Sequence, residues 1–152
     1  MAQRSGAPVR VLVVDRQPLF RRGVADVVAH ETGLAVVGET GDGLAVLDLV
    51  SQHDADLVLL DLGVPGGGVE ACALLRAARP DVRVVVMTQA DDDADLAGAV
   101  RAGARGYLLK DTSPEELVEA LRAVAAGESR ELPAATARRA STSSSGLVSL
   151  SR

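Results

Sequence analysis

The sequence is nearly without aromatic residues. It has no tryptophan, and Phe20 and Tyr107 are its only aromatic side chains. Hydrophobic residues still make up 47% of the 152 positions, so a core must be built mainly from Val, Leu and Ala. A chain of this length predicts one domain with room for a short tail.

Cysteine is almost absent as well. Cys72 is the only one, which excludes an internal disulfide and fits a reducing cytoplasm. Because Cys72 falls in an apolar helical segment, we expect a buried structural thiol. No apolar run approaches the ~18 residues of a membrane span, and the first ten residues lack the apolar stretch of a signal peptide. We therefore expect a cytoplasmic protein with no membrane partner.

An excess of positive charge is also lacking. The net charge is −5, which argues against a basic nucleic-acid-binding surface on this chain. Of the sixteen basic residues only Lys110 is a lysine, and it falls at the end of an apolar segment.

Five apolar segments alternate with helical patterns along the chain. The predicted strands are Val9–Asp15, Leu34–Gly38, Leu57–Asp61, Arg83–Thr88 and Gly106–Lys110. The predicted helices are Pro18–His30, Leu44–Gln52 with Leu44, Leu47 and Val50 facing inward, Val69–Arg79, Asp91–Ala102, and a last helix from a capping box at Ser113–Glu116 to Gly127. This alternation predicts an α/β fold, a doubly wound five-stranded parallel sheet with helices on both faces.

The two ends of the chain differ from this pattern. Residues 1–8 are polar, and we expect them to be disordered. The domain proper is predicted over 9–127. Residues 128–152 are rich in Ser, Ala and Arg and are typical of a linker, with a short helix over Pro133–Ala140.

Reactive side chains stand where the predicted strands end. Asp15, Asp61, Thr88 and Lys110 close four of the five strands, and such ends lie along one edge of a doubly wound sheet. A carboxylate flanked by an ammonium and a hydroxyl suits a nucleophile for phosphoryl transfer, and the Gly-rich loop after Asp61 lets a phosphate or metal come close. The alternative is a salt bridge between Asp61 and Lys110 beside a passive Thr88.

Several sequence blocks, in order, resemble the receiver domain of NarL/FixJ-type two-component response regulators. They are VLVVDRQPLFRRGV, VVGETGDG, LVLLDLGVPGG, RVVVMT and RAGARGYLLKDTSPEELVEALRAVAAGES, and the resemblance covers about Val9–Ser129. The resemblance implies a flavodoxin-like (βα)5 fold with strand order 2-1-3-4-5.

The resemblance also implies roles. Asp61 would be the phospho-acceptor, Thr88 and Tyr107 the switch residues, and Lys110 the phosphoryl partner, with a histidine kinase as the phosphate source. A homodimer is expected through a face that includes the helix Ser113–Ala126; other members use their first and last helices.

The C-terminal residues suggest a further domain. Val148-Ser149-Leu150-Ser151-Arg152 resembles the start of the LuxR-type helix-turn-helix that family members carry. We interpret the chain as cut at that point, so that DNA would be bound only through a domain absent from it. The alternative is a natural single-domain protein.

The sequence departs from the family at Arg16. The family has a second acid there, which binds Mg²⁺ directly, and a guanidinium supplies no ligand oxygen. Asp15 and Asp61 face Arg16 and Lys110, a formal sum of zero without metal. We expect Arg16 to pair with Asp15, Asp61 or both, and Mg²⁺ to bind weakly or not at all; if it binds, its ligands would be Asp15, Asp61 and the Gly63 carbonyl. The alternative is that Arg16 turns to solvent and another ligand substitutes.

Two smaller departures lie nearby. The loop after Asp61 is one residue shorter than is usual in the family, and Gln89 stands where a small residue often borders the pocket, so that it would restrict access of a phosphodonor. The sequence therefore favours an atypical receiver without enzymatic activity, which controls dimerisation or DNA binding. The alternatives are a conventional receiver phosphorylated on Asp61, a stand-alone protein- or ligand-binding module, and, less favoured, a small phosphohydrolase.

Overall fold

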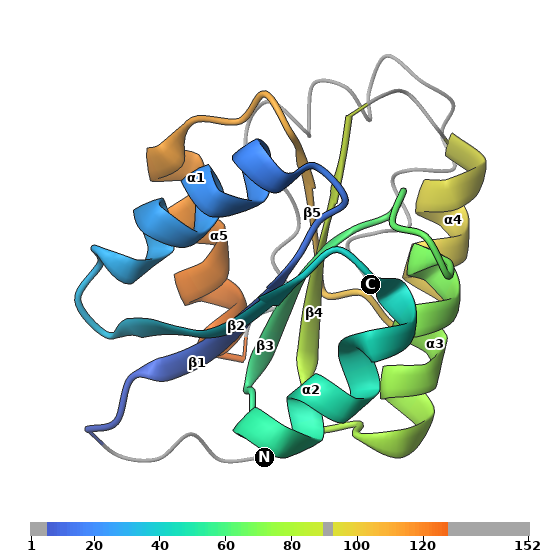
Figure 1. The fold of residues 1–152 in the computed structure, drawn as a ribbon, viewed down its shortest axis with the longest axis horizontal. Helices are drawn as coiled ribbons and strands as arrows, with labels where there is room; N and C mark the ends of the chain where they lie inside the picture. The colour runs from blue at the N-terminus through green and yellow to red at the C-terminus, as the bar shows by residue number, and fades with distance from the viewer. Residues whose placement is uncertain (1–5, 90–92, 128–152) are drawn as a thin grey trace.

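The computed structural model describes residues 6–89 and 93–127, which form a five-stranded parallel sheet between two layers of helices (Figure 1). The strands are β1 (Val9–Val14), β2 (Leu34–Thr40), β3 (Leu57–Asp61), β4 (Arg83–Thr88) and β5 (Gly106–Leu109). Their order is β2-β1-β3-β4-β5, and every neighbouring pair is parallel. The predicted fold class and strand order are confirmed.

The helices divide between the two faces of the sheet. They are α1 (Pro18–Ala29), α2 (Val46–His53), α3 (Gly68–Ala78), α4 (Asp93–Arg101) and α5 (Pro114–Ala125). Figure 1 shows α1 and α5 on one face and α2, α3 and α4 on the other. This is the double winding that right-handed crossovers produce when the strand order reverses after β2.

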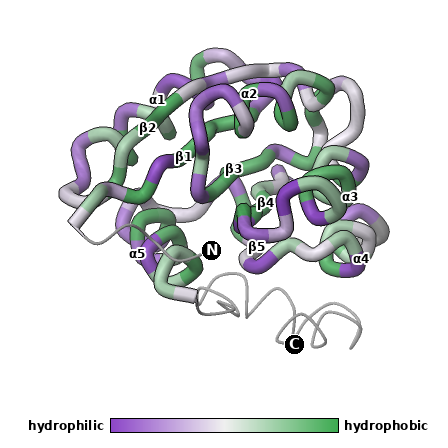
Figure 2. The backbone as a smooth tube through the Cα atoms, turned by 90° about the horizontal axis from the view of Figure 1, so that it is seen from below, coloured by the Kyte–Doolittle hydropathy of each residue, from purple (hydrophilic) through white to green (hydrophobic). Residues whose placement is uncertain are grey.

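Each face of the sheet has its own aliphatic core. In β3, Leu57 and Leu59 belong to the cluster beneath α1 and α5, whereas Val58 and Leu60 belong to the cluster beneath the other three helices. Successive side chains of a strand point to opposite faces, so a strand buried on both sides is a continuous apolar run. Most of β3 has the colour of hydrophobic residues in Figure 2, and all five residues of this strand are buried.

One predicted core position is wrong. Leu44 was expected to face inward, but its side chain is 76% exposed. Residues Gly43–Ala45 form a 3₁₀ turn, capped by Asp42, whose carboxylate accepts the Leu44 N–H at 2.9 Å. A 3₁₀ turn has three residues instead of 3.6, which shifts the phase of the face, and the α-helix that follows buries Val46 and Val50.

The last helix begins as its sequence predicts. The Ser113 hydroxyl accepts the Glu116 N–H at 3.1 Å, and the Glu116 carboxylate accepts the Ser113 N–H at 3.3 Å, which completes the capping box. Leu117, Val118, Leu121 and Val124 form its buried face, as expected.

Some predictions fall outside the described residues. They concern most of the polar N-terminal segment, the start of the helix predicted from Asp91, the linker, its short helix and the resemblance to a helix-turn-helix. Within the described part of the chain, no helix is both long enough and apolar enough to cross a bilayer.

Cys72 is buried, as predicted, with 1% of its surface exposed. Burial raises the pKa of its thiol to about 11, although nearby Arg76 acts in the opposite direction. The thiolate is the reactive form, so the folded chain protects this residue chemically as well as sterically.

We predict that iodoacetamide at pH 8 alkylates Cys72 roughly a hundredfold more slowly in the native protein than in urea, since the thiolate fraction falls about tenfold for each unit by which the pKa rises. The native rate should increase as the pH is raised toward 11. Mass spectrometry of timed samples gives both rates, and equal rates in the two states would contradict the prediction.

Candidate functional site

The strand order brings the predicted residues to one edge of the sheet. Asp15 directly follows β1, Asp61 and Thr88 are the last residues of β3 and β4, and Lys110 directly follows β5. These strands are neighbours in the sheet, and the Lys110 N–H donates to the Thr88 carbonyl at 2.9 Å. The predicted gathering of two carboxylates, the lysine and the hydroxyl-bearing residue at this edge is confirmed.

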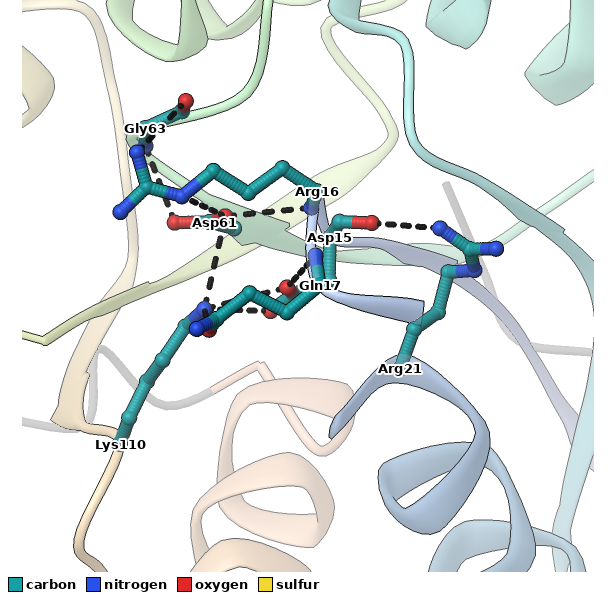
Figure 3. Close-up of polar contacts among 7 residues, drawn as sticks. All are labelled: Asp15, Arg16, Gln17, Arg21, Asp61, Gly63 and Lys110. Carbon is teal, nitrogen blue, oxygen red and sulfur yellow. Dashed lines mark hydrogen bonds and ion pairs between the residues drawn. The ribbon is translucent and has the colours of Figure 1, made fainter. Parts of the chain in front are cut away.

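Lys110 lies at the centre of the site (Figure 3). Its Nζ is 2.9 Å from Asp15 Oδ2 and 3.4 Å from Asp61 Oδ2, and it donates to Gln17 Oε1 at 2.6 Å. The ammonium also lies 4.6 Å from the centre of the Phe20 ring, within range of a cation–π interaction. Only 6% of the lysine side chain is exposed, so these acceptors replace its hydration.

Asp61 is held in one orientation. Its Oδ1 accepts the Gly63 N–H at 3.0 Å, and its Oδ2 accepts the Arg16 N–H at 3.3 Å. Asp15 is fixed in a similar way, because its Oδ1 accepts the Gln17 N–H at 2.8 Å. Both carboxylates are buried, so backbone N–H groups supply part of the hydrogen bonding that water would otherwise provide.

The Arg16 side chain extends across Asp61 toward the next loop (Figure 3). Its Nε is 3.6 Å from Asp61 Oδ2, and its Nη1 donates to the Gly63 carbonyl at 3.3 Å. The predicted pairing of Arg16 with Asp61 is confirmed. Among the described residues, Lys110 rather than Arg16 is the cation paired with Asp15. The Arg16 side chain is 46% exposed and that of Asp61 only 2%, so Arg16 lies on the solvent side of the carboxylate.

A second arginine, Arg21, supports the site from α1. Its Nη1 donates to the Asp15 carbonyl at 2.7 Å, and its Nε lies 3.5 Å from Glu39 Oε1 on β2. Arg21 thus joins the end of β1 to its neighbouring strand. No sequence motif predicted a role in the site for Arg21, Gln17 or Phe20. The one feature of the sequence that could have indicated their role is that all three follow Asp15 within the next six residues.

Of the two remaining candidate residues, one follows a strand end and the other lies in the core. Gln89 follows β4 directly and is exposed. Tyr107 is 2% exposed and belongs to the core cluster beneath α2, α3 and α4. The roles predicted for both residues rest on the family resemblance alone.

The oxygen atoms of the site are already paired with protein cations. The predicted metal ligands are the carboxylates of Asp15 and Asp61 and the Gly63 carbonyl, and each of them contacts Lys110 or Arg16. Among the described residues, no group of three or more His, Cys, Asp or Glu side chains could hold a metal ion. As arranged, these oxygen atoms are therefore occupied by protein cations, and a metal ion would have to displace Arg16 to reach Asp61 and the Gly63 carbonyl.

Comparison with known proteins gives a consistent result. Residues 11–122 match the family model of the response regulator receiver domain. The chain is 42% identical over 121 residues to the uncharacterized transcriptional regulatory protein YxjL of Bacillus subtilis and 41% identical over 121 residues to the nitrate/nitrite response regulator protein NarP of Escherichia coli. Each alignment covers 79% of this chain and 56% of the relative, so the chain spans about half the length of these relatives.

The backbone of the chain is also similar to that of a solved structure. The signal receiver domain of the putative response regulator NarL from Mycobacterium tuberculosis is 38% identical in sequence, with a TM-score of 0.76. The match covers 80% of this chain and 99% of that domain.

We predict that Lys110→Met lowers the free energy of unfolding by about 3–5 kcal/mol, because it leaves two buried carboxylates without their shared cation. The double variant Asp15→Asn/Lys110→Met should lose less than the sum of the two single variants. Urea unfolding followed by circular dichroism measures all three. Arg105→Met, which removes an exposed cation just before β5, is the control, and a loss no larger than that of the control would contradict the prediction.

Proposed function

The chain belongs to the response regulator receiver domain family, in its NarL-type branch, and on this premise we propose that it is an atypical signal-input domain. It controls dimerisation or DNA binding of a transcription regulator, with weak or no Mg²⁺-dependent phosphorylation of Asp61. Receiver domains are signalling modules rather than typical enzymes.

The contact between Arg16 and Asp61 is the observation that carries this proposal. Arg16 stands where the family resemblance expects a metal-binding acid, and its guanidinium reaches both Asp61 and the Gly63 carbonyl. With Lys110, it balances the two carboxylates without a metal. A pocket of this kind holds the loops after β1 and β3 together at all times, and the domain would take its signal through another surface.

A conventional receiver is the second candidate, and the same site supports it. Asp61, Thr88 and Lys110 occupy the places that the resemblance assigns to phospho-acceptor, switch hydroxyl and phosphoryl partner, with Tyr107 on the neighbouring strand. Because Arg16 is 46% exposed, its side chain can swing out and admit Mg²⁺. In that case a histidine kinase supplies the phosphoryl group. A third hypothesis is a stand-alone protein- or ligand-binding module that acts without a DNA-binding domain.

The proposed link to DNA rests on the relatives. YxjL is a transcriptional regulatory protein and NarP a response regulator, and this chain matches 56% of each. The net charge of −5 disfavours direct binding of DNA by the chain itself. We therefore place DNA binding in a domain outside the matched region.

The proposed dimer face includes α1 and α5. A hollow of about 380 Å³ lies between them, lined mainly by apolar side chains that include Phe20, Pro114 and Leu117. Leu19, at its rim, is 90% exposed, which is unusual for a large apolar side chain. A second copy that covers this hollow would remove Leu19 from water.

For the pocket, we predict that the wild-type protein shows no Mg²⁺ binding at millimolar concentration and that Arg16→Asp gains it, because the change replaces a cation with a ligand oxygen. Acetyl phosphate should then modify Asp61 far faster in the variant. Calorimetry and phosphate-affinity gels measure the two effects, with Arg105→Asp as a control of equal charge change. Wild-type protein that binds millimolar Mg²⁺ and is readily phosphorylated would favour the conventional receiver.

For the dimer face, we predict a weak or moderate homodimer that Leu19→Glu weakens by roughly tenfold or more, as expected when a charge replaces an apolar side chain that the second copy would cover. Leu74→Glu places the same charge on α3, where Leu74 is 51% exposed, and should leave association unchanged. Sedimentation velocity over a concentration series gives the dissociation constants. A wild-type protein that stays monomeric at high concentration would refute the dimer.

A further inference from the structure

Gly63 contacts the site through both of its backbone polar groups. Its N–H donates to Asp61 Oδ1 at 3.0 Å, and its carbonyl accepts the Arg16 Nη1 at 3.3 Å. The acceptor that holds Arg16 is therefore the same carbonyl that would become a ligand if a metal ion were bound. The position of the Arg16 guanidinium therefore determines whether the Gly63 carbonyl is free to bind a metal ion.

The space beside Gly63 is filled by the guanidinium. A Cβ added at this position would lie 2.6 Å from Arg16 Nη1, 2.7 Å from Cζ and 3.1 Å from Nη2. Contacts below 3.0 Å essentially never occur for real Cβ atoms, so a side chain at position 63 and Arg16 in its present place exclude each other. Glycine is thus needed here for the close approach of a neighbouring side chain.

The backbone conformation does not explain the glycine. Gly66 and Gly67, in the same loop, have φ values of +88° and +94°, but Gly63 is outside this left-handed group. An alanine at position 63 therefore meets no backbone strain. The three atoms in its way belong to the end of a long, half-exposed side chain, so Arg16 would move and the loop would stay.

We propose that Gly63 is the residue that determines which cation the Asp61 pocket holds. Because glycine has no side chain, the guanidinium of Arg16 can lie against the loop at this position. A side chain at position 63 would displace the guanidinium and leave the Asp61 carboxylate and the carbonyl of residue 63 open to a divalent ion. This inference rests on the proposed function, in which Arg16 takes the place of the metal.

The charges of the site favour this exchange. When the guanidinium leaves, Asp15, Asp61 and Lys110 remain with a formal charge of −1, which attracts a cation. The ion pair of Arg16 with Asp61 is half-exposed and measures 3.6 Å, so it is weak and screened by solvent. A steric clash at position 63 is therefore enough to break this ion pair. Without such a clash, Arg16 competes well with a free metal ion for Asp61 because it belongs to the same chain and is always nearby.

The test is Gly63→Ala, followed by ¹⁵N NMR of the Arg16 Nε–H and by titration with Mg²⁺, with Mn²⁺ as a paramagnetic probe of the same site. We expect the Nε–H signal to move to the position of a solvent-exposed arginine, and the affinity for Mg²⁺ to rise by at least about threefold, the scale of one screened ion pair. Gly23→Ala is the matched control, since a Cβ at Gly23 meets nothing within 4 Å.

A second comparison distinguishes displacement of the Arg16 guanidinium from a general loosening of the loop after β3. In the Arg16→Ala background, Gly63→Ala should leave the affinity for Mg²⁺ unchanged, because there is no guanidinium to expel. A similar gain in both backgrounds would overturn the inference, as would an Arg16 Nε–H signal that Gly63→Ala does not move. If the wild-type protein itself binds Mg²⁺ and is readily phosphorylated, the proposed function fails. The Nε–H signal still shows independently whether Gly63 holds the Arg16 guanidinium in place.

Discussion

The site depends on one buried cation. Lys110 joins the ends of β1, β3 and β5 through Asp15 and Asp61, and it is almost fully removed from water. Charges buried in this way stay ionised only if their partners are close and their remaining hydrogen bonds are made. Gln17 and the Phe20 ring complete the surroundings of the ammonium, so the first turn of α1 is held to the same point. Three strand ends and one helix are thereby fixed relative to one another.

Arg16 and Lys110 act on Asp61 in different ways. Lys110 approaches from the interior and is fixed by several acceptors, whereas Arg16 approaches from the solvent side and depends on a glycine for its place. The contact of Lys110 with Asp61 is buried, whereas the contact of Arg16 with Asp61 is half-exposed and screened by solvent. This division lets the sheet edge stay intact while the solvent-facing side of the pocket changes.

The strands and the strand-end residues were predictable because they follow from local patterns, whereas the strand order was implied by the resemblance to the receiver family. Leu57–Asp61 is a strand in both prediction and structure, and the edge residues of the sheet follow from it. Leu44 failed because a 3₁₀ turn changes the helical phase, which hydrophobic spacing does not reveal. The contact of Gln17 with Lys110 spans 93 positions of sequence, so no local pattern encodes it. The pairing of Arg16 with Asp61 was predictable only because an unusual cation stood beside an expected carboxylate.

The scarcity of lysine has a consequence for covalent chemistry. All other cationic side chains of the chain are arginine or histidine, so an acylating enzyme or amine-directed reagent has a single side-chain target, and that target is the Nζ atom at the strand ends. Acylation there would remove the positive charge and leave both carboxylates uncompensated. Since this atom is buried, it can be modified only when the edge of the sheet opens. The rate at which Lys110 itself is labelled is therefore a measure of how often that edge separates.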